Sequence, residues 1–441
     1  MKVLKFGGTS VGSAQRMKDV AKLITDGEQK IVVLSAMSGT TNTLVEISDY
    51  LYKKNPEGAN EIINRLEAKY KQHIDELYST EEYKQKTLDF VKSVFDYIRS
   101  YTKDIFTLFE EKVILAQGEI ISTNMVTNYL CEQGVNATLI PALEYMRTDK
   151  NSEPDLTYIR EKLSAQLEAN PDYEIYITQG FICRNAYGEI DNLQRGGSDY
   201  TASLIGAAIN ASEIQIWTDI DGMHDNDPRV VDKTSPVRQL HFEEAAELAY
   251  FGAKILHPTC IQPAKYANIP VRLLNTMEPT APGTLISNDT EKGKIKAVAA
   301  KGNITAIKIK SSRMLLAHGF LRKVFEIFES YQTPIDMVCT SEVGVSMSID
   351  NTKHLNEIVN DLKKYGTVTV DHDMCIVCVV GDLEWENVGF EAKALDAMRE
   401  IPVRMISFGG SNYNISFLIR ESDKKQALQS LSNVLFNGNQ K

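Results

Sequence analysis

Lys5-Phe-Gly-Gly-Thr-Ser10 and Arg195-Gly-Gly-Ser-Asp199 are the two stretches that decide the fold. An apolar run with the character of a β-strand lies upstream of each, and a run with helical character follows each. A strand, a glycine turn and the start of a helix present backbone N–H groups and the positive end of a helix dipole, which together favour phosphate or carboxylate. Glycine is required where a Cβ would keep the backbone away from the anion. Two such loops, far apart in the sequence, predict one anion site built from both.

A third corner of the same kind follows the short apolar run 30–35, where the small polar stretch Ser35-Ala-Met-Ser-Gly-Thr-Thr-Asn42 leads into a helix. Further strands are expected at 137–140, 174–178, 214–217 and 270–274. Between residues 60 and 110 the apolar positions recur at helical spacing, so these helices are expected to pack against the core. Alternating strands and helices predict an α/β fold, a mostly parallel sheet sandwiched by helices, with ligands outside the carboxyl ends of the strands.

The composition is that of a globular protein, with 43% hydrophobic and 24% charged residues among 441. The formal net charge of −11 argues against nucleic acid or an anionic membrane as the main partner. No apolar run reaches the roughly 18 residues of a membrane span, and the N-terminus does not resemble a signal peptide. The six cysteines are scattered, so we expect reduced thiols, a structural role for Cys375 and Cys378, and a cytoplasmic location.

The composition changes near residue 280, and beyond it the chain repeats itself. In the first copy we expect strands at 304–309, 335–339 and 345–349 and helices at 319–328 and 354–362. In the second copy we expect strands at 375–380, 403–406 and 415–419 and helices at 388–398 and 424–431. Two βαββα units of this size predict two small sheets side by side, with room for a small ligand between them.

Three cations, Lys5, Arg195 and Lys254, stand beside predicted loops. Phosphoryl transfer needs such fixed cations, together with N–H donors, around the charge that spreads over its transition state. Glu119 follows a glycine and is expected at the start of a helix, where a carboxylate is either a helix-end charge or a functional group.

A loop with mixed charges follows the predicted strand 214–217. Its residues Thr218, Asp219, Asp227 and Arg229 combine acids, a hydroxyl and a cation at a strand end. This pattern is typical of a turn-rich loop, and it also suits a nucleotide with a nearby divalent metal.

Six blocks together resemble the aspartokinases of the amino-acid kinase superfamily. They are Lys5–Ser10, Gly118-Glu119, Arg195–Thr201, Thr218-Asp219, Asp227-Pro-Arg229 and Phe251–Pro258. The C-terminal repeat resembles the ACT regulatory domains of these enzymes. The resemblance covers essentially the whole chain. It implies an amino-acid kinase fold over residues 1–290, followed by two βαββαβ ferredoxin-like ACT domains at 300–441, approximately 300–370 and 371–441, in an arrangement that can be interleaved.

The activity implied by the resemblance is phosphorylation of the β-carboxylate of L-aspartate by ATP with Mg²⁺, giving 4-phospho-L-aspartate and ADP. This reaction is the first step towards lysine, threonine and methionine. The resemblance also implies a homodimer or higher homo-oligomer and feedback inhibition by L-lysine, with threonine-type regulation and insensitivity left open as alternatives. Because the chain ends soon after the second repeat, we expect a kinase without a fused homoserine dehydrogenase.

The resemblance assigns roles residue by residue, and it assigns no metal ligand. The catalytic residues are Lys5, which would contact the transferring phosphoryl group, Gly7, Gly8, Asp199 and Lys254. The substrate-binding residues are Ser35, Thr41, Glu119 for the ammonium group, Arg195 for the α-carboxylate and Ser198. The nucleotide-binding residues are Lys5, Thr218, Asp219, Arg229 and Lys254. The effector-binding residues are Met314, Phe320, Leu321, Asp336, Thr340 and Ser341. The chain departs from the family at Gln194, where glycine is usual, and at His224, where tyrosine is common.

Two alternative functions remain open from the sequence. A kinase for another amino-acid carboxylate would keep Lys5 and Asp199 but would lack this C-terminal repeat. A non-catalytic amino-acid sensor would keep the repeat but would lose the cations at Lys5, Arg195 and Lys254.

Overall fold

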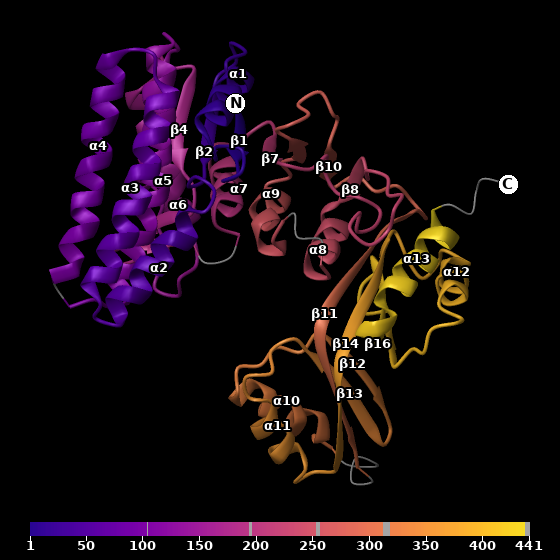
Figure 1. Cartoon of the computed structure of the whole chain (residues 1–441). Helices are drawn as coiled ribbons and strands as arrows, with labels where there is room; N and C mark the ends of the chain where they lie inside the picture. The colour runs from indigo at the N-terminus through magenta and orange to yellow at the C-terminus, as the bar shows by residue number, and fades with distance from the viewer. Residues whose placement is uncertain (104, 194–195, 253–255, 312–317, 437–441) are drawn as a thin grey trace. The chain divides into compact units, whose positions relative to one another are not determined.

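The computed structural model describes residues 1–103, 105–193, 196–252, 256–311 and 318–436 (Figure 1). The chain forms two compact units. The first comprises Met1–Met223 and Ile255–Asn288, and the second comprises His224–Lys254 and Asp289–Lys441. The segment 224–254 therefore belongs to the second unit, although the sequence of the first unit surrounds it.

The first unit is built on a sheet with the strand order β3-β4-β2-β1-β7-β9-β10. These strands are β1 (Lys2–Phe6), β2 (Lys30–Leu34), β3 (Ala137–Leu139), β4 (Ile175–Gln179), β7 (Ile214–Thr218), β9 (Val271–Asn275) and β10 (Thr284–Ser287). Neighbouring strands from β3 to β9 are parallel, and β10 is antiparallel to β9. A separate antiparallel hairpin is formed by β5 (Ile182–Arg184) and β6 (Ile190–Asn192). The mostly parallel sheet predicted from the sequence is confirmed.

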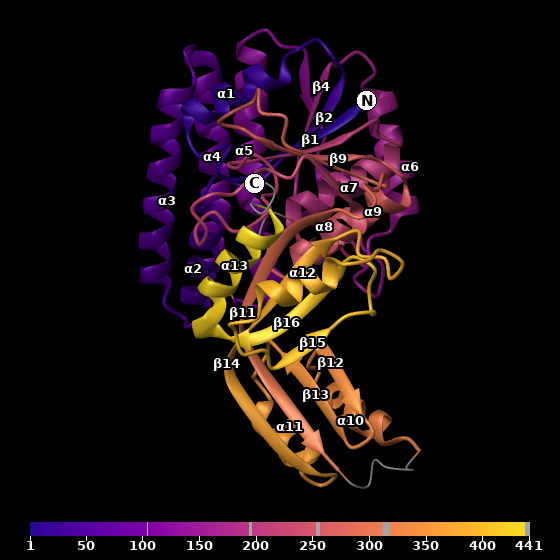
Figure 2. The same ribbon diagram turned by 90° about the vertical axis from the view of Figure 1, so that its right-hand side faces the viewer.

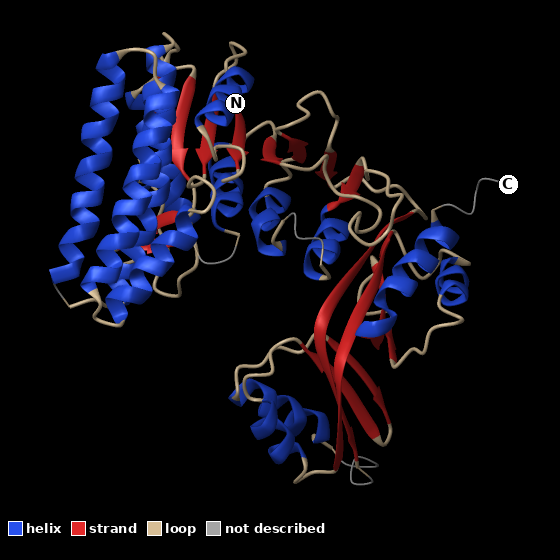
Figure 3. Ribbon diagram, in the orientation of Figure 1, coloured by secondary structure: helices blue, strands red, loops and turns tan. Residues whose placement is uncertain are grey.

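Helices cover both faces of this sheet (Figure 3). They are α1 (Ala14–Ile24), α2 (Thr40–Tyr52), α3 (Pro56–Leu77), α4 (Glu81–Ser100), α5 (Leu108–Glu132), α6 (Leu156–Ala169), α7 (Gly197–Ile209) and α9 (Gln262–Tyr266), with short 3₁₀ helices at Tyr101–Lys103, Ala142–Glu144 and Pro258–Ile261. Helices α1 to α5 share one core with alternate residues of the strands, such as Phe6 and Leu34. The intervening residues Val3 and Val33 are buried as well, and α7 packs against β1, β2 and β7. A sheet buried on both faces explains the continuous apolar runs of its strands.

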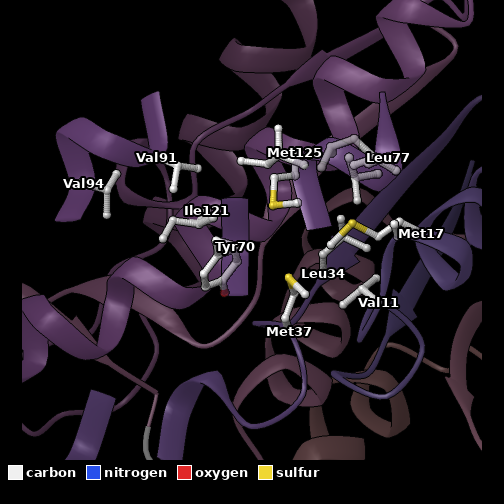
Figure 4. Packing of buried hydrophobic residues seen from close by; sticks show 14 of the residues in the cluster. Val11, Met17, Leu34, Met37, Tyr70, Leu77, Val91, Val94, Ile121 and Met125 are labelled. Atoms are coloured by element: carbon white, nitrogen blue, oxygen red, sulfur yellow. The ribbon is translucent and has the colours of Figure 1, made fainter. Parts of the chain in front are cut away.

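The helical region predicted between 60 and 110 forms α3 and α4, and its apolar face points into the core. Figure 4 shows Tyr70, Leu77 and Val91 of these helices turned towards Leu34 of the sheet and Ile121 of α5. Side chains at every third or fourth position of a helix share one face, which is why this spacing predicted the packing correctly.

The second unit contains a six-stranded sheet in the order β12-β13-β11-β14-β16-β15. These strands are β11 (Ile295–Lys310), β12 (Met337–Ser341), β13 (Gly344–Ile349), β14 (Thr367–Gly381), β15 (Met405–Ser407) and β16 (Asn414–Arg420). The other elements are β8 (Gln239–His241), α8 (Phe242–Tyr250), α10 (Phe320–Ser330), α11 (Leu355–Leu362), α12 (Phe390–Ala397), a 3₁₀ helix at Glu421–Asp423 and α13 (Lys424–Leu435).

The two repeats are joined by the long strands β11 and β14, which run antiparallel and side by side (Figure 2). Residues 304–310 and 367–371 belong to one repeat, whose core includes α10 and α11. Residues 295–301 and 374–381 belong to the other, whose core includes α12 and α13. The expectation of two separate sheets is therefore wrong, because each long strand serves both repeats. One edge strand of the second repeat is the N-terminal half of β11, which comes before the first repeat in the sequence.

Cys375 and Cys378 lie on β14 and are fully buried, with the thiols of both free. Burial raises the pKa of the Cys375 thiol to about 12. A separation of three residues along a strand places the two side chains on opposite faces, so they do not form a redox pair. Within the described ranges, no helix is both long enough and apolar enough to cross a bilayer.

Candidate active site

A cavity of about 320 Å³ lies at the carboxyl ends of β1, β2 and β4. It is lined by Gly8, Ser35, Ala36, Met37, Ser38, Gly39, Thr41, Asn42, Glu119, Phe181, Gly197 and Ser198. Helices α2 and α7 both begin here, each after a glycine with a positive φ and without a side-chain cap. The structure thus brings together the first glycine loop, the 35–42 corner and the start of α7. Their N-terminal ends favour an anion in the cavity.

The loop after β1 lies against the loop after β2. The Ser38 N–H donates to the Gly8 carbonyl at 3.1 Å. A Cβ at Gly8 would lie 2.8 Å from the Ala36 carbonyl oxygen, so a side chain does not fit there. The Gly7 N–H points to the Trp217 carbonyl of β7 at 3.4 Å, which ties the same loop to the next strand.

Lys5 and Asp199 form an ion pair beside this loop, with Lys5 Nζ 2.7 Å from Asp199 Oδ1. Their side chains are only 11% and 16% exposed. Lys5 stands near the end of β1, and Asp199 lies in the first turn of α7. The ion pair compensates the cost of burying either charge alone, and it lies at the first turn of α7, whose start lines the cavity.

Glu119 is the most deeply buried acid of the cavity, with 4% of its surface exposed. Its Oε1 accepts a hydrogen bond from the Ala36 N–H at 3.1 Å. Among the described residues, no group hydrogen-bonds to its Oε2. Burial raises the pKa of Glu119 to about 8, although the Ala36 N–H and the charge of Lys5 act in the opposite direction. A buried carboxyl with one unused oxygen is suited to receive a cationic group.

The prediction that Glu119 starts a helix is wrong. Helix α5 begins after a capping box, in which Thr107 and Glu110 satisfy each other's backbone N–H groups, and it runs continuously through Gly118. A Cβ at Gly118 would lie 2.8 Å from the Ala36 Cβ, so this glycine lets the helix approach the cavity loop. The Thr-x-x-Glu spacing at 107–110 is the sequence signal that could have placed the helix start correctly.

Hydroxyl groups complete the lining. The Ser35 hydroxyl donates to Ser198 Oγ at 2.9 Å, and the Ser122 hydroxyl donates to the Ser35 carbonyl at 2.8 Å. Thr41, in the first turn of α2, also lines the cavity. Sequence reasoning missed Phe181, which lines the cavity with a φ of 69°. No local pattern announces a positive φ at a phenylalanine.

The predicted nucleotide residues follow different elements. Thr218 ends β7, where its Oγ1 accepts from the Ile220 N–H at 3.3 Å, and the next residue, Asp219, is exposed. Arg229 belongs to the second unit and makes a two-point ion pair with Asp227, with distances of 2.9 and 2.8 Å. Any contact of the Arg229 guanidinium with a nucleotide would therefore be made by a group that already pairs with Asp227.

Several predicted residues, Gln194, Arg195, Lys254 and Met314, lie outside the described residues. His224 is described, and its Nδ1 lies 2.9 Å from Thr234 Oγ1.

The remaining residues predicted to bind an effector lie around α10 and β12. Phe320 is buried in the core of the first repeat, whereas Leu321 is exposed on the next position of the helix. Thr340 and Ser341, at the end of β12, are exposed. Asp336, just before β12, is paired with Lys301 at 2.9 Å.

Comparison with known proteins gives a consistent result over the full length. Residues 1–275 match the amino acid kinase family, and residues 377–435 match an ACT domain. Aspartokinase 1 of Arabidopsis thaliana, a chloroplastic protein, is 35% identical over 98% of this chain and 80% of its own length. Lysine-sensitive aspartokinase 3 of Escherichia coli is 32% identical over 98% of this chain and 99% of its own.

Two solved structures of Escherichia coli aspartokinase III are also similar to this chain. The complex with aspartate and ADP, in the R-state, has a TM-score of 0.85 at 31% identity and covers 99% of this chain and 100% of its own. The complex with lysine and aspartate, in the T-state, has a TM-score of 0.80 at 32% identity and covers 99% of each chain.

Proposed function

Because the chain belongs to the aspartokinase family, we propose that it transfers the γ-phosphoryl group of ATP to the β-carboxylate of L-aspartate. The products are 4-phospho-L-aspartate and ADP. The observation that carries the proposal is the cavity of the first unit, where buried Glu119 and the Lys5–Asp199 ion pair meet two helix N-termini. The Escherichia coli relative that was solved with aspartate and ADP supports the choice of both substrates.

Glu119 receives the ammonium group of aspartate in this proposal. Its Oε2 has no hydrogen-bond partner among the described residues, and an ammonium group there would supply the missing cation. Ser35, Thr41 and Ser198 offer hydroxyl groups to the carboxylates of the substrate, with Arg195 as their cationic partner. A guanidinium suits this task because its planar fork matches a carboxylate.

Lys5 meets the negative charge of the transferring phosphoryl group, assisted by the backbone of Gly7 and Gly8 and by Lys254. Asp199 holds the Lys5 ammonium in place through their 2.7 Å ion pair. The β-carboxylate oxygen of aspartate attacks the γ-phosphorus, and the bond from that phosphorus to the bridging oxygen of ADP breaks. No general base is needed, because the attacking carboxylate is ionised near neutral pH.

The nucleotide is assigned to Thr218 and Asp219 after β7, and to Arg229. The position of β7 next to β1 in the sheet supports this assignment, since the two strand ends then lie beside each other. Mg²⁺ enters with ATP as part of the nucleotide substrate, and its charge offsets the phosphate charge.

We also propose feedback inhibition by L-lysine at the first repeat, through Met314, Phe320, Leu321, Asp336, Thr340 and Ser341. The lysine-bound T-state of the Escherichia coli relative supports the choice of effector.

A homodimer or larger homo-oligomer is proposed as the working state, which light scattering of the purified chain would measure. The free cysteines among the described residues favour a cytoplasmic location.

The test is ADP release with Mg·ATP and L-aspartate, with L-glutamate and N-acetyl-L-glutamate as competing acceptors. Turnover that depends on aspartate and that lysine suppresses is expected. Turnover with another acceptor alone would identify a different amino-acid kinase. Folded protein that binds lysine but releases no ADP with any acceptor would identify a sensor and overturn the proposal.

A further inference from the structure

The second unit contains a cluster of four polar side chains that the kinase reaction does not use. Lys301 Nζ lies 2.9 Å from Asp336 Oδ1 and 2.8 Å from Asp350 Oδ2. The Tyr250 hydroxyl, at the end of α8, donates to the same Asp336 Oδ1 at 2.9 Å. The Lys301 ammonium also lies 4.5 Å from the centre of the Tyr250 ring. The Asp336 side chain is only 2% exposed, so these contacts replace water around it.

The cluster has an excess of negative charge. With Tyr250 neutral as a hydrogen-bond donor, two carboxylates face one ammonium, and the sum is one negative charge. Within the part of the chain that the structure describes, Asp336 Oδ2 is buried without a hydrogen-bond partner. Burial raises the pKa of Asp336, while Lys301 and Tyr250 oppose that shift. One further cation would complete the cluster, which is the chemistry of an amino acid with a second ammonium group.

The second repeat provides an internal comparison. The Asp336 N–H donates to the Ser348 carbonyl at 2.8 Å, and the Arg404 N–H donates to the Leu418 carbonyl at 2.7 Å. Each residue immediately precedes the short strand of its repeat, β12 or β15, so Asp336 and Arg404 hold equivalent positions. One is an acid and the other is a base.

The ion-pair partners of Asp336 and Arg404 are also opposite in charge, one a base and the other an acid. Lys301 and Asp371 hold equivalent positions on the two long strands. Ile304 of β11 pairs directly with Met374 of β14, and Lys301 and Asp371 each lie three residues before these paired positions. Lys301 pairs with the acid of the first repeat, whereas Asp371 pairs with Arg404 at 2.7 Å. The pair of the second repeat is neutral in sum. The excess negative charge is thus a property of the first repeat.

The cluster also holds the end of α8. This helix packs against β11 and β14, and Gly252 follows it at a φ of 122°. A Cβ at Gly252 would lie 2.3 Å from the carbonyl oxygen of Ala300, the neighbour of Lys301. The end of α8 is therefore fixed to the sheet by close backbone contact and by the hydrogen bond from Tyr250 to Asp336.

We propose that the ammonium group of a cationic amino acid competes with Lys301 and Tyr250 for the Asp336 carboxylate, and that the hydrogen bond from Tyr250 links this competition to the end of α8. The inference rests on the lysine effector site of the proposed function. Lys301 is then an internal counter-ion that sets the effector affinity, and loss of the Tyr250 bond is the structural consequence of effector binding.

The test measures L-lysine binding by calorimetry, and the lysine concentration for half-inhibition, on the full chain. Tyr250→Phe and Lys301→Met are each expected to tighten lysine binding roughly fivefold, equivalent to about 1 kcal/mol, because each removes a competitor. Tyr331→Phe removes a similar bond, to Asp361 at 2.9 Å, and Arg404→Met breaks the equivalent pair of the second repeat. Both matched controls are expected to keep the affinity of the unmodified chain.

The outcomes separate the two proposals. Unchanged lysine affinity in Tyr250→Phe overturns the competition, even where Lys301→Met does not fold. Tighter binding in Tyr250→Phe, with the lysine-free turnover and the maximal suppression by lysine both unchanged, overturns the link to α8, because this variant already lacks the bond that would carry the signal. Asp336→Asn is expected to weaken lysine binding more than tenfold, and unchanged binding in that variant overturns the effector assignment itself.

Discussion

Replacing Glu119 with glutamine is expected to stabilise the first unit at neutral pH and to abolish aspartate binding. The pKa of the buried carboxyl is raised to about 8 from an ordinary value of 4.5. Between these values the unfolded chain releases a proton that the folded chain retains, so the stability of the unmodified protein falls as the pH rises through this range. At 1.36 kcal/mol per unit, the loss reaches roughly 5 kcal/mol near pH 8 as an upper bound. Glutamine avoids this loss and still offers an oxygen to the Ala36 N–H.

Thermal unfolding at pH 5 and pH 8 measures this effect. The melting temperature of Glu119→Gln is expected to exceed that of the unmodified chain by several degrees at pH 8 and by much less at pH 5. The conversion is about 2 to 4 °C per kcal/mol for a unit of this size. Glu67→Gln is the matched control, because Glu67 is similarly buried but pairs with Arg99 and Lys71. These cations lower the pKa of Glu67, so its replacement is expected to cost stability above pH 5. An equal difference in melting temperature between Glu119→Gln and the unmodified chain at both pH values would refute the reasoning.

Other residues give sharper tests of single contacts. Lys5→Ala is expected to lower kcat by about 10²- to 10³-fold with little change in the KM for aspartate, and steady-state kinetics showing only a KM effect would contradict its role. Gly196→Ala is expected to destabilise the first unit by roughly 2 kcal/mol or more beyond Gly27→Ala. Both glycines have a positive φ, but a Cβ at Gly196 would lie 1.8 Å from Cys260 Sγ, whereas a Cβ at Gly27 meets nothing within 4 Å. Comparable melting temperatures of these two variants would count against that clash.

Local patterns located the glycine loop and the strand ends beside the cavity, because these patterns coincide with the rules of parallel sheets. Lys5, near the end of β1, and Ser35, directly after β2, lie at one edge of the sheet because these neighbouring strands are parallel, and the start of α7 brings Ser198 to Ser35 and Asp199 to Lys5. The resemblance assigned the ammonium group to Glu119, and this residue lines the same cavity. Glycine loops, strand ends and helix starts are encoded within a few residues, so they are visible without a structure.

Features that depend on distant contacts were not visible. The shared strands β11 and β14 belong to both repeats, and no pattern within either repeat reveals that their pairing continues past residue 301. The ion pair of Lys301 with Asp336 joins residues 35 positions apart, one on β11 and the other just before β12. The burial of Asp336 was not visible either, because it is decided by the packing of α8 and β11 around it.

The raised pKa of Glu119 is expected to link substrate binding to proton release. In the unliganded protein at pH 7, a carboxyl with a pKa of about 8 is mostly protonated. Holding the ammonium group of aspartate requires the ionised form, so each binding event is expected to release nearly one proton at pH 7. Calorimetry in two buffers with different ionisation enthalpies measures this number directly. The affinity for aspartate is accordingly expected to rise up to roughly tenfold per unit between pH 6 and pH 8. Binding without proton release at pH 7 would mean that Glu119 is already ionised in the free protein, and that another group neutralises it.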